Sequence, residues 1–161
     1  MKKIISLFFL IIAFSFSENV YSQVDSTTLN SSSITSNTTL SRTTTYIMKG
    51  FNYIQSGATL TIEPGTKIYG DFETKGTLII QRGAKIYANA SANDPIVFTS
   101  EKPAGQRAAG DWGGIIILGR SAINTSTGAD SAEIEGFGPG LGPIYGGQPV
   151  DRKSTRLNSS H

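Results

Sequence analysis

The sequence predicts an all-β solenoid, a right-handed parallel β-helix, and three observations lead to this fold class. A twelve-residue segment that starts at Thr59 recurs from Thr77, eighteen residues later, with seven of its twelve positions identical. Apolar residues alternate with polar ones in short runs, which is the period of a strand. Helical apolar periodicity is missing after the N-terminal segment. Short strands wound into stacked coils account for all three observations.

The N-terminus predicts a secretory signal peptide over residues 1–22. Met1-Lys2-Lys3 is a basic start, and the apolar run that follows it is too short to span a bilayer. Val20-Tyr21-Ser22 offers a cleavage site, so we expect the mature chain to begin at Gln23. The sequence contains no cysteine, so an exported form must be stable through packing alone.

Residues 23–33 are rich in Ser and Thr and predict a flexible leader. The coils are expected over residues 34–150, as an incomplete β-helix. Besides the repeat, this region has short runs with strand character, which are Tyr46–Lys49, Tyr53–Gln55 and Pro95–Thr99. A Greek-key sandwich is the main alternative topology for such a set of strands.

Each copy of the repeat has the pattern of a strand, a turn and a second strand. Leu60 and Ile62 share one face of the first strand, and Ile68 begins the next strand after the turn. Glu63-Pro64-Gly65-Thr66 suits a type II turn, because glycine tolerates the positive φ of the second central position. Gly83 has the same place in the second copy. If the eighteen-residue offset is one coil, successive copies stack about 4.8 Å apart.

An unbroken apolar run from Ile115 to Leu118 predicts a further parallel strand, because strands covered on both faces commonly have such runs. Ile115 and Ile117 are expected to point into the core. Ile116 and Leu118 are expected to point outward or to lie under a loop. The glycine-rich segment 136–147 lacks the ending of a phosphate-binding loop and predicts a loop between coils.

Residues 151–161 resemble a translated sequencing adapter, so we expect a non-native tail and exclude it from the fold. Without this tail and the predicted signal peptide, the formal net charge falls from +2 to −1. The segment between them has no run of Lys or Arg, so nucleic acid is not an expected partner. It also lacks an apolar run long enough for a transmembrane segment in the mature chain.

Four motifs occur together along the chain, and these are Gly57–Thr66, Gly76–Ile86, Asp94–Ser100 and Gly110–Gly119. In combination they resemble secreted and cell-surface proteins of the Bacteroidetes with a pectin-lyase-like β-helix, of the type associated with type IX secretion. The resemblance implies an exported protein at the outer surface of a Gram-negative bacterium. Family members are often much longer and end in sorting or adhesive modules, so we expect this chain to be an N-terminal fragment.

The residue types restrict the chemistry. The sole histidine, His161, lies in the predicted tail, and without it Ser-His-Asp and Cys-His sites cannot be assembled and zinc lacks its usual ligands. Glycosidases use paired carboxylates, and lyases similar to this family use calcium-bound carboxylates. Asp71 with Glu73, and Glu133 with Glu135, are the pairs to consider, and we interpret them as a solvated loop and a solvated strand face. The sequence thus predicts no catalytic residue and no cofactor, and it does not support calcium.

Asp111 and Trp112 precede two glycines, Gly113 and Gly114, that permit a tight bend. A carboxylate beside an indole could form a sugar-stacking platform. We favour a structural corner, because these residue types are typical of a glycine-rich turn.

An outward ladder is the candidate ligand surface. If one coil spans eighteen residues, Tyr69 stacks on Tyr87 and Lys67 stacks on Lys85, which would give an aromatic and cationic face for a glycan strand. The alternative is ordinary aromatic stacking between coils, which stabilises sheets by itself.

From these features we predict an exported bacterial surface, adhesive or scaffold module without catalytic activity in this segment. Polysaccharides or cell-surface components are the expected partners. The alternative is the N-terminal part of a polysaccharide lyase or glycoside hydrolase whose active groove lies in later coils.

Overall fold

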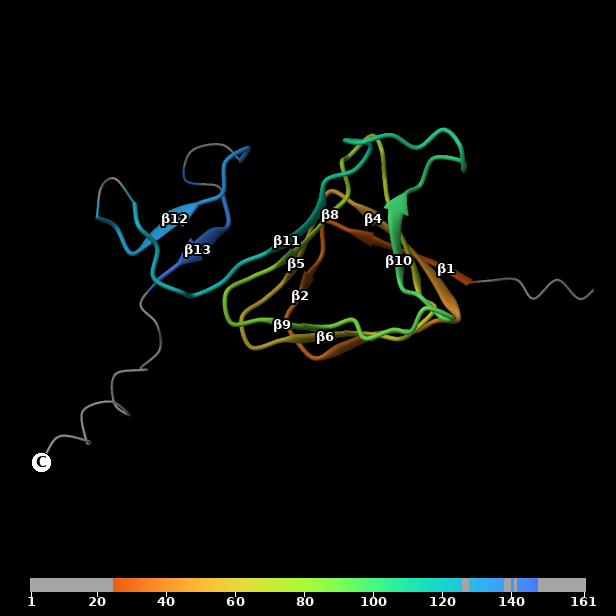
Figure 1. Cartoon of the computed structure of the whole chain (residues 1–161), viewed down its shortest axis with the longest axis horizontal. Helices are drawn as coiled ribbons and strands as arrows, with labels where there is room; N and C mark the ends of the chain where they lie inside the picture. The colour runs from red at the N-terminus through yellow and green to blue at the C-terminus, as the bar shows by residue number, and fades with distance from the viewer. Residues whose placement is uncertain (1–24, 126–127, 138–139, 141, 148–161) are drawn as a thin grey trace, which may run out of the picture.

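The computed structural model describes residues 25–125, 128–137, 140 and 142–147. Every regular element in these residues is a β-strand, and most of the strands wind into a right-handed parallel β-helix (Figure 1). The predicted fold class is therefore confirmed. The predicted signal peptide (1–22) and the predicted tail (151–161) lie outside the described residues.

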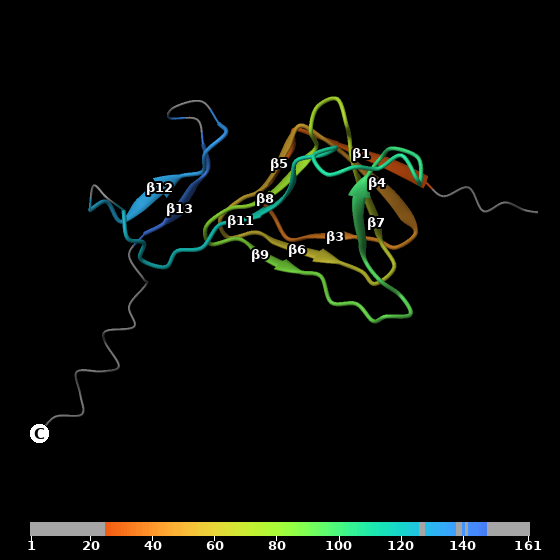
Figure 2. The same ribbon diagram turned by 45° about the horizontal axis from the view of Figure 1, so that its top comes forward.

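Three parallel sheets form the sides of the coil, which has a triangular outline in Figures 1 and 2. Sheet A consists of β1 (Asp25–Asn30), β4 (Thr44–Lys49), β7 (Lys67–Gly70) and β10 (Val97–Ser100). Sheet B consists of β2 (Ser33–Ile34), β5 (Phe51–Ile54), β8 (Thr77–Ile80) and β11 (Gly114–Ile117). Sheet C consists of β3 (Thr38–Leu40), β6 (Thr59–Ile62) and β9 (Lys85–Tyr87). The chain passes through the sheets in the order A, B, C and then begins the next coil.

The core consists of side chains that point inward from all three sheets. In-register pairing places residues of neighbouring coils on the same face, so inward side chains form columns. One column of isoleucines crosses all four strands of sheet B, and it contains Ile34, Ile54, Ile80 and Ile117. Ile54 is completely buried, and Ile80 is 2% exposed. Burial of each such side chain stabilises the fold by about 1.5–3 kcal/mol.

A buried amide links three coils. Asn52 on β5 has no exposed surface, and its Oδ1 accepts hydrogen bonds from the backbone N–H and the hydroxyl of Ser32 at 3.1 and 2.8 Å. Its Nδ2 donates to the carbonyls of Lys49, Gly50 and Thr77 at 3.1, 3.2 and 3.4 Å. Because Ser32, Asn52 and Thr77 belong to successive coils, this single side chain holds three coils in register.

The first coil begins earlier than the sequence predicted. Residues 23–33 were expected to form a flexible leader, but β1 covers Asp25–Asn30 and pairs along its whole length with β4. Ser and Thr lower the apolar content of this segment. Its backbone N–H and C=O groups nevertheless form hydrogen bonds with β4 in the next coil. Parallel pairing therefore overrides the local composition.

The interpretation of the eighteen-residue offset as one coil is wrong. The first copy of the repeat spans β6 and β7, and the second spans β8 and β9, so the two copies lie at different corners of the triangle. What recurs is a strand, a tight turn and a strand. Gly65 and Gly83 both have positive φ, 81° and 83°, and both turns close with a hydrogen bond between residues three apart. The repeat thus encodes a corner.

The segment after β11 leaves the triangle and forms an antiparallel hairpin of β12 (Ser131–Glu133) and β13 (Ile144–Gly146), at the left of Figure 1. The hairpin lies beside the outer face of sheet B. Phe137 contacts Phe51 with 4.7 Å between ring centroids, and the N–H of Gly146 donates to the carbonyl of Gly119. The glycine-rich segment 136–147 was expected to be a loop between coils, and its last part is instead a strand of this hairpin.

β11 lies at one end of the described stack. Ile115 and Ile117 pair with Leu78 and Ile80, so they have the inward orientation that the sequence predicted. They are 39% and 67% exposed, because no further coil covers them within the described residues. Leu118, which was expected outward or under a loop, is buried beside the hairpin at 6% exposure.

The role of Asn52 in coil register can be tested by replacement. Asn52→Ala leaves the N–H and the hydroxyl of Ser32 without their acceptor, and each unsatisfied group costs about 1–3 kcal/mol. The carbonyls of Lys49 and Gly50 keep backbone N–H donors from Ser31 and Thr77. We expect urea denaturation to show a loss of at least about 2 kcal/mol in the free energy of unfolding. The control is Gln55→Ala, which removes one exposed hydrogen bond to Ser33 and should change stability by about 0.5 kcal/mol or less. Equal losses in both variants would contradict this role.

Candidate functional site

Asp111 lies just before β11, in the segment that joins sheets A and B in the last described coil, and it is 4% exposed. Its Oδ1 accepts a hydrogen bond from the Nζ of Lys102 at 2.8 Å, and its Oδ2 accepts one from the N–H of Ala108 at 2.8 Å. The hydrogen bond from Lys102, followed by that from Ala108, holds the pKa of this carboxyl below its ordinary value. The carboxylate therefore stays ionised and fastens the loop between β10 and β11.

Trp112 fills the space beside a glycine of the preceding coil. Its side chain packs against the hydrophobic core, and a Cβ on Gly70 would lie 2.5 Å from the Cβ of Trp112. Gly113 is equally restricted, because a Cβ there would overlap the hydroxyl of Thr77. Gly114 has a φ of 81°, which favours glycine. The four residues predicted as a corner thus lie together at the bend that leads into β11.

Asp71 was expected in a solvated loop, but it is buried at 5% exposure. Its Oδ2 accepts hydrogen bonds from both the N–H and the hydroxyl of Thr74 at 2.7 Å, and its Oδ1 lies 3.6 Å from the Nζ of Lys49. The two hydrogen bonds from Thr74, with a smaller effect of Lys49, lower the pKa of Asp71. Its neighbour Glu73 is exposed. The spacing of the two carboxylates suggested a pair, but the turn directs them into different environments.

These two corners are connected through an aromatic side chain. The ammonium groups of Lys75 and Lys102 lie 4.1 and 3.6 Å from the ring centroid of Phe72. Lys75 also donates to the carbonyl of Gly110 at 3.0 Å. The loop after β7 is thus fastened to the loop before β11. The ammonium groups of Lys75 and Lys102 make this contact.

The expected Tyr and Lys ladder does not form. Tyr69 and Lys67 are on β7 in sheet A, where Tyr69 pairs with Ile47 and Thr99. Tyr87 and Lys85 are on β9 in sheet C and pair with β6. The predicted stacking depended on an eighteen-residue coil, and the true register separates the two pairs onto different faces of the triangle. Each of these tyrosines therefore lies on its own sheet.

The remaining carboxylate pair is exposed but does not share a strand, because β12 ends at Glu133 and Glu135 lies in the turn that follows. Glu133 and Glu135 are exposed, while Ile134 between them is half-buried. Within the described residues, no group of three or more His, Cys, Asp or Glu side chains is placed to hold a metal ion.

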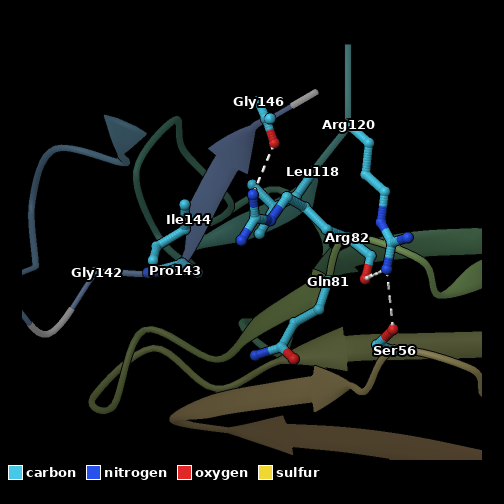
Figure 3. Close-up of a pocket in the computed structure, with 10 residues that line it drawn as sticks. Ser56, Gln81, Arg82, Leu118, Arg120, Gly142, Pro143, Ile144 and Gly146 are labelled. Atoms are coloured by element: carbon cyan, nitrogen blue, oxygen red, sulfur yellow. Dashed lines mark hydrogen bonds between the residues drawn. The ribbon is translucent and has the colours of Figure 1, made fainter. Parts of the chain in front are cut away.

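A cavity of about 570 Å³ lies between the corner that joins sheets B and C and the hairpin (Figure 3). Sequence reasoning missed it. Two guanidinium groups line it, from Arg82 in the turn after β8 and from Arg120 after β11. Arg82 lies in the second copy of the repeat and Arg120 directly follows the Gly110–Gly119 motif, and neither pattern indicates that the two are neighbours, so only the coil register brings them together. Arg82 donates to the carbonyl of Gly146 at 2.7 Å, which attaches the hairpin to the coil.

Three parallel sheets form the sides of stacked coils around an inward apolar core, and this architecture defines the protein as a parallel β-helix solenoid. Residues 32–158 match the family model described as a pectate-lyase-like β-helix domain, and the chain belongs to that family. Comparison with curated proteins and with solved structures returns no match. No helix formed by the described residues is long and apolar enough to cross a membrane.

The two buried aspartates predict a dependence of stability on acid. Their pKa values in the folded chain lie below the ordinary value, so the ionised forms stabilise the fold above about pH 4. This contribution is lost as the pH falls further through the folded-state pKa values. We expect urea denaturation to show falling stability below about pH 4.

An Asp71→Asn, Asp111→Asn double variant should be less stable at neutral pH and should lose less stability on acidification. Glu73→Gln is the matched control, because Glu73 is exposed in the same loop. An unchanged acid dependence in the double variant would show that other groups control the acid response.

Proposed function

We propose that this chain is a surface, adhesive or scaffold module of an exported bacterial protein, and that the described coils do not carry out catalysis. The observation that supports the absence of catalysis most directly is that the buried carboxylates are held in hydrogen bonds and ion pairs that stabilise the fold. Asp71 and Asp111, the buried acidic residues of the described chain, each accept hydrogen bonds within their own corner and lie beside a lysine. Such a carboxylate is fixed as a structural anion and is unsuited to proton transfer near neutral pH.

The family membership supports the coarser part of this proposal, which is a carbohydrate-related or surface β-helix module. The β-helix offers a rigid rod whose outward side chains do not disturb the inward columns. Exposed side chains on sheets A and C, such as Lys67, Lys85 and Tyr87, can therefore take part in contacts without loss of core packing. A scaffold of this kind needs stability and an accessible surface.

A polysaccharide panel tests the proposal. The full chain is incubated with acidic and neutral polysaccharides, and the release of reducing or unsaturated sugar is measured beside binding by affinity electrophoresis. We expect retardation by at least one polysaccharide and no product above the buffer control.

Release of product that is abolished by Asp71→Asn or Asp111→Asn, in variants with an unchanged circular dichroism spectrum, would contradict the scaffold function and favour an enzyme. Failure to bind any polysaccharide or bacterial surface preparation would contradict the adhesive part of the proposal.

A further inference from the structure

The cavity between the coil and the hairpin has the charge of an anion-binding site. Its lining residues include Arg82 and Arg120 and no Asp or Glu. The ion pairs found among the described residues involve Arg42, Lys49 and Lys102. Neither Arg82 nor Arg120 takes part in these ion pairs between described residues.

Neutral groups hold both guanidinium groups in place. Nη2 of Arg120 donates to the hydroxyl of Ser56 at 3.3 Å and to the carbonyl of Arg82 at 3.4 Å. It lies directly over Gly83, where an added Cβ would overlap it. Arg82 is fixed through its Nη1 to the carbonyl of Gly146. Contacts with hydroxyl and carbonyl oxygens orient a guanidinium without neutralising it, so the cost of ordering these side chains falls on folding and not on binding.

Each guanidinium keeps donors for a ligand. A guanidinium has five N–H donors, and the described residues supply one acceptor for Arg82 and two for Arg120. Figure 3 shows both side chains at the cavity, with Arg82 directed toward Gly146 and Arg120 toward Ser56. Planar guanidinium groups bind carboxylate and sulfate oxygens with paired, charge-assisted hydrogen bonds.

The rest of the cavity suits the neutral part of a small molecule. Leu118, Pro143 and Ile144 contribute apolar surface, while Ser56 and Gln81 contribute polar groups. The volume of about 570 Å³ lies within the range of roughly 300–1,000 Å³ that is typical of small-molecule sites. An inorganic ion alone would leave most of this volume to water.

We propose that this cavity binds a small organic anion whose carboxylate or sulfate group is held by Arg82 and Arg120, and whose neutral part lies against Leu118, Pro143 and Ile144. This inference goes beyond the scaffold function and does not rest on it. Failure of either proposal leaves the other unaffected, because polysaccharide cleavage and binding of a small anion are measured separately.

Isothermal titration calorimetry of the full chain tests the proposal with three probes, which are sodium glucuronate, glucose and sodium sulfate in a low-salt buffer. Glucuronate and glucose share a sugar ring and differ in the carboxylate. We expect saturable binding of glucuronate, competition by sulfate at the same site and no binding of glucose. Tighter binding of sulfate than of glucuronate would overturn the organic part of the proposal, and equal binding of glucose would overturn the role of the arginines.

Arg120→Gln is the decisive variant, because it removes one guanidinium and leaves the bond between Arg82 and Gly146 in place. We expect at least a tenfold loss of glucuronate affinity. Ile144→Glu retains both arginines but adds a negative charge to the lining, and it should abolish binding.

Arg42→Gln is the matched control, since Arg42 is an exposed arginine that pairs with Asp94 away from the cavity. Its affinity should equal that of the unmodified chain. Unchanged affinity in both Arg120→Gln and Ile144→Glu, or an equal loss in Arg42→Gln, would overturn the proposal.

Discussion

Parallel hydrogen bonding between consecutive coils is the constraint on which the other features depend. A strand in this stack must present its N–H and C=O groups to the coils on either side, so residues in register share one face. The inward column of Ile34, Ile54, Ile80 and Ile117 follows directly from this pairing. The spacing between its members increases along the chain. The register between strands thus stays the same from coil to coil while the connections between strands lengthen. The core therefore tolerates coils of unequal length.

The longer connections produce the features outside the core. The segment between β10 and β11 contains Lys102 and Asp111, and their ion pair fastens this loop together with the hydrogen bond from Lys75 to Gly110. The segment after β11 returns as the β12–β13 hairpin, and Arg82 attaches that hairpin to the preceding coil. Both the corner and the cavity therefore arise from insertions placed between strands whose register does not change.

The alternation of apolar residues was sufficient to predict the fold class and the inward residues Leu60, Ile62 and Ile68, because burial on one face has a local signature. Coil length was not predictable from the repeat, since the same corner sequence occurs at two different corners. The burial of Asp71 depends on Thr74 and Lys49, and the cavity depends on residues that become neighbours only through register. Sequence spacing carries no information on such contacts.

Engineered cysteine pairs test the coil register most directly, and the sequence has no native cysteine to interfere. Ile47 and Tyr69 are partners in the structure, and adjacent parallel strands lie about 4.8 Å apart, within disulfide range. An Ile47→Cys, Tyr69→Cys variant should form an intramolecular disulfide under mild oxidation, whereas Tyr69→Cys, Tyr87→Cys should not. A disulfide in the second variant and none in the first would show that the eighteen-residue repeat sets the coil, and would contradict the register described here.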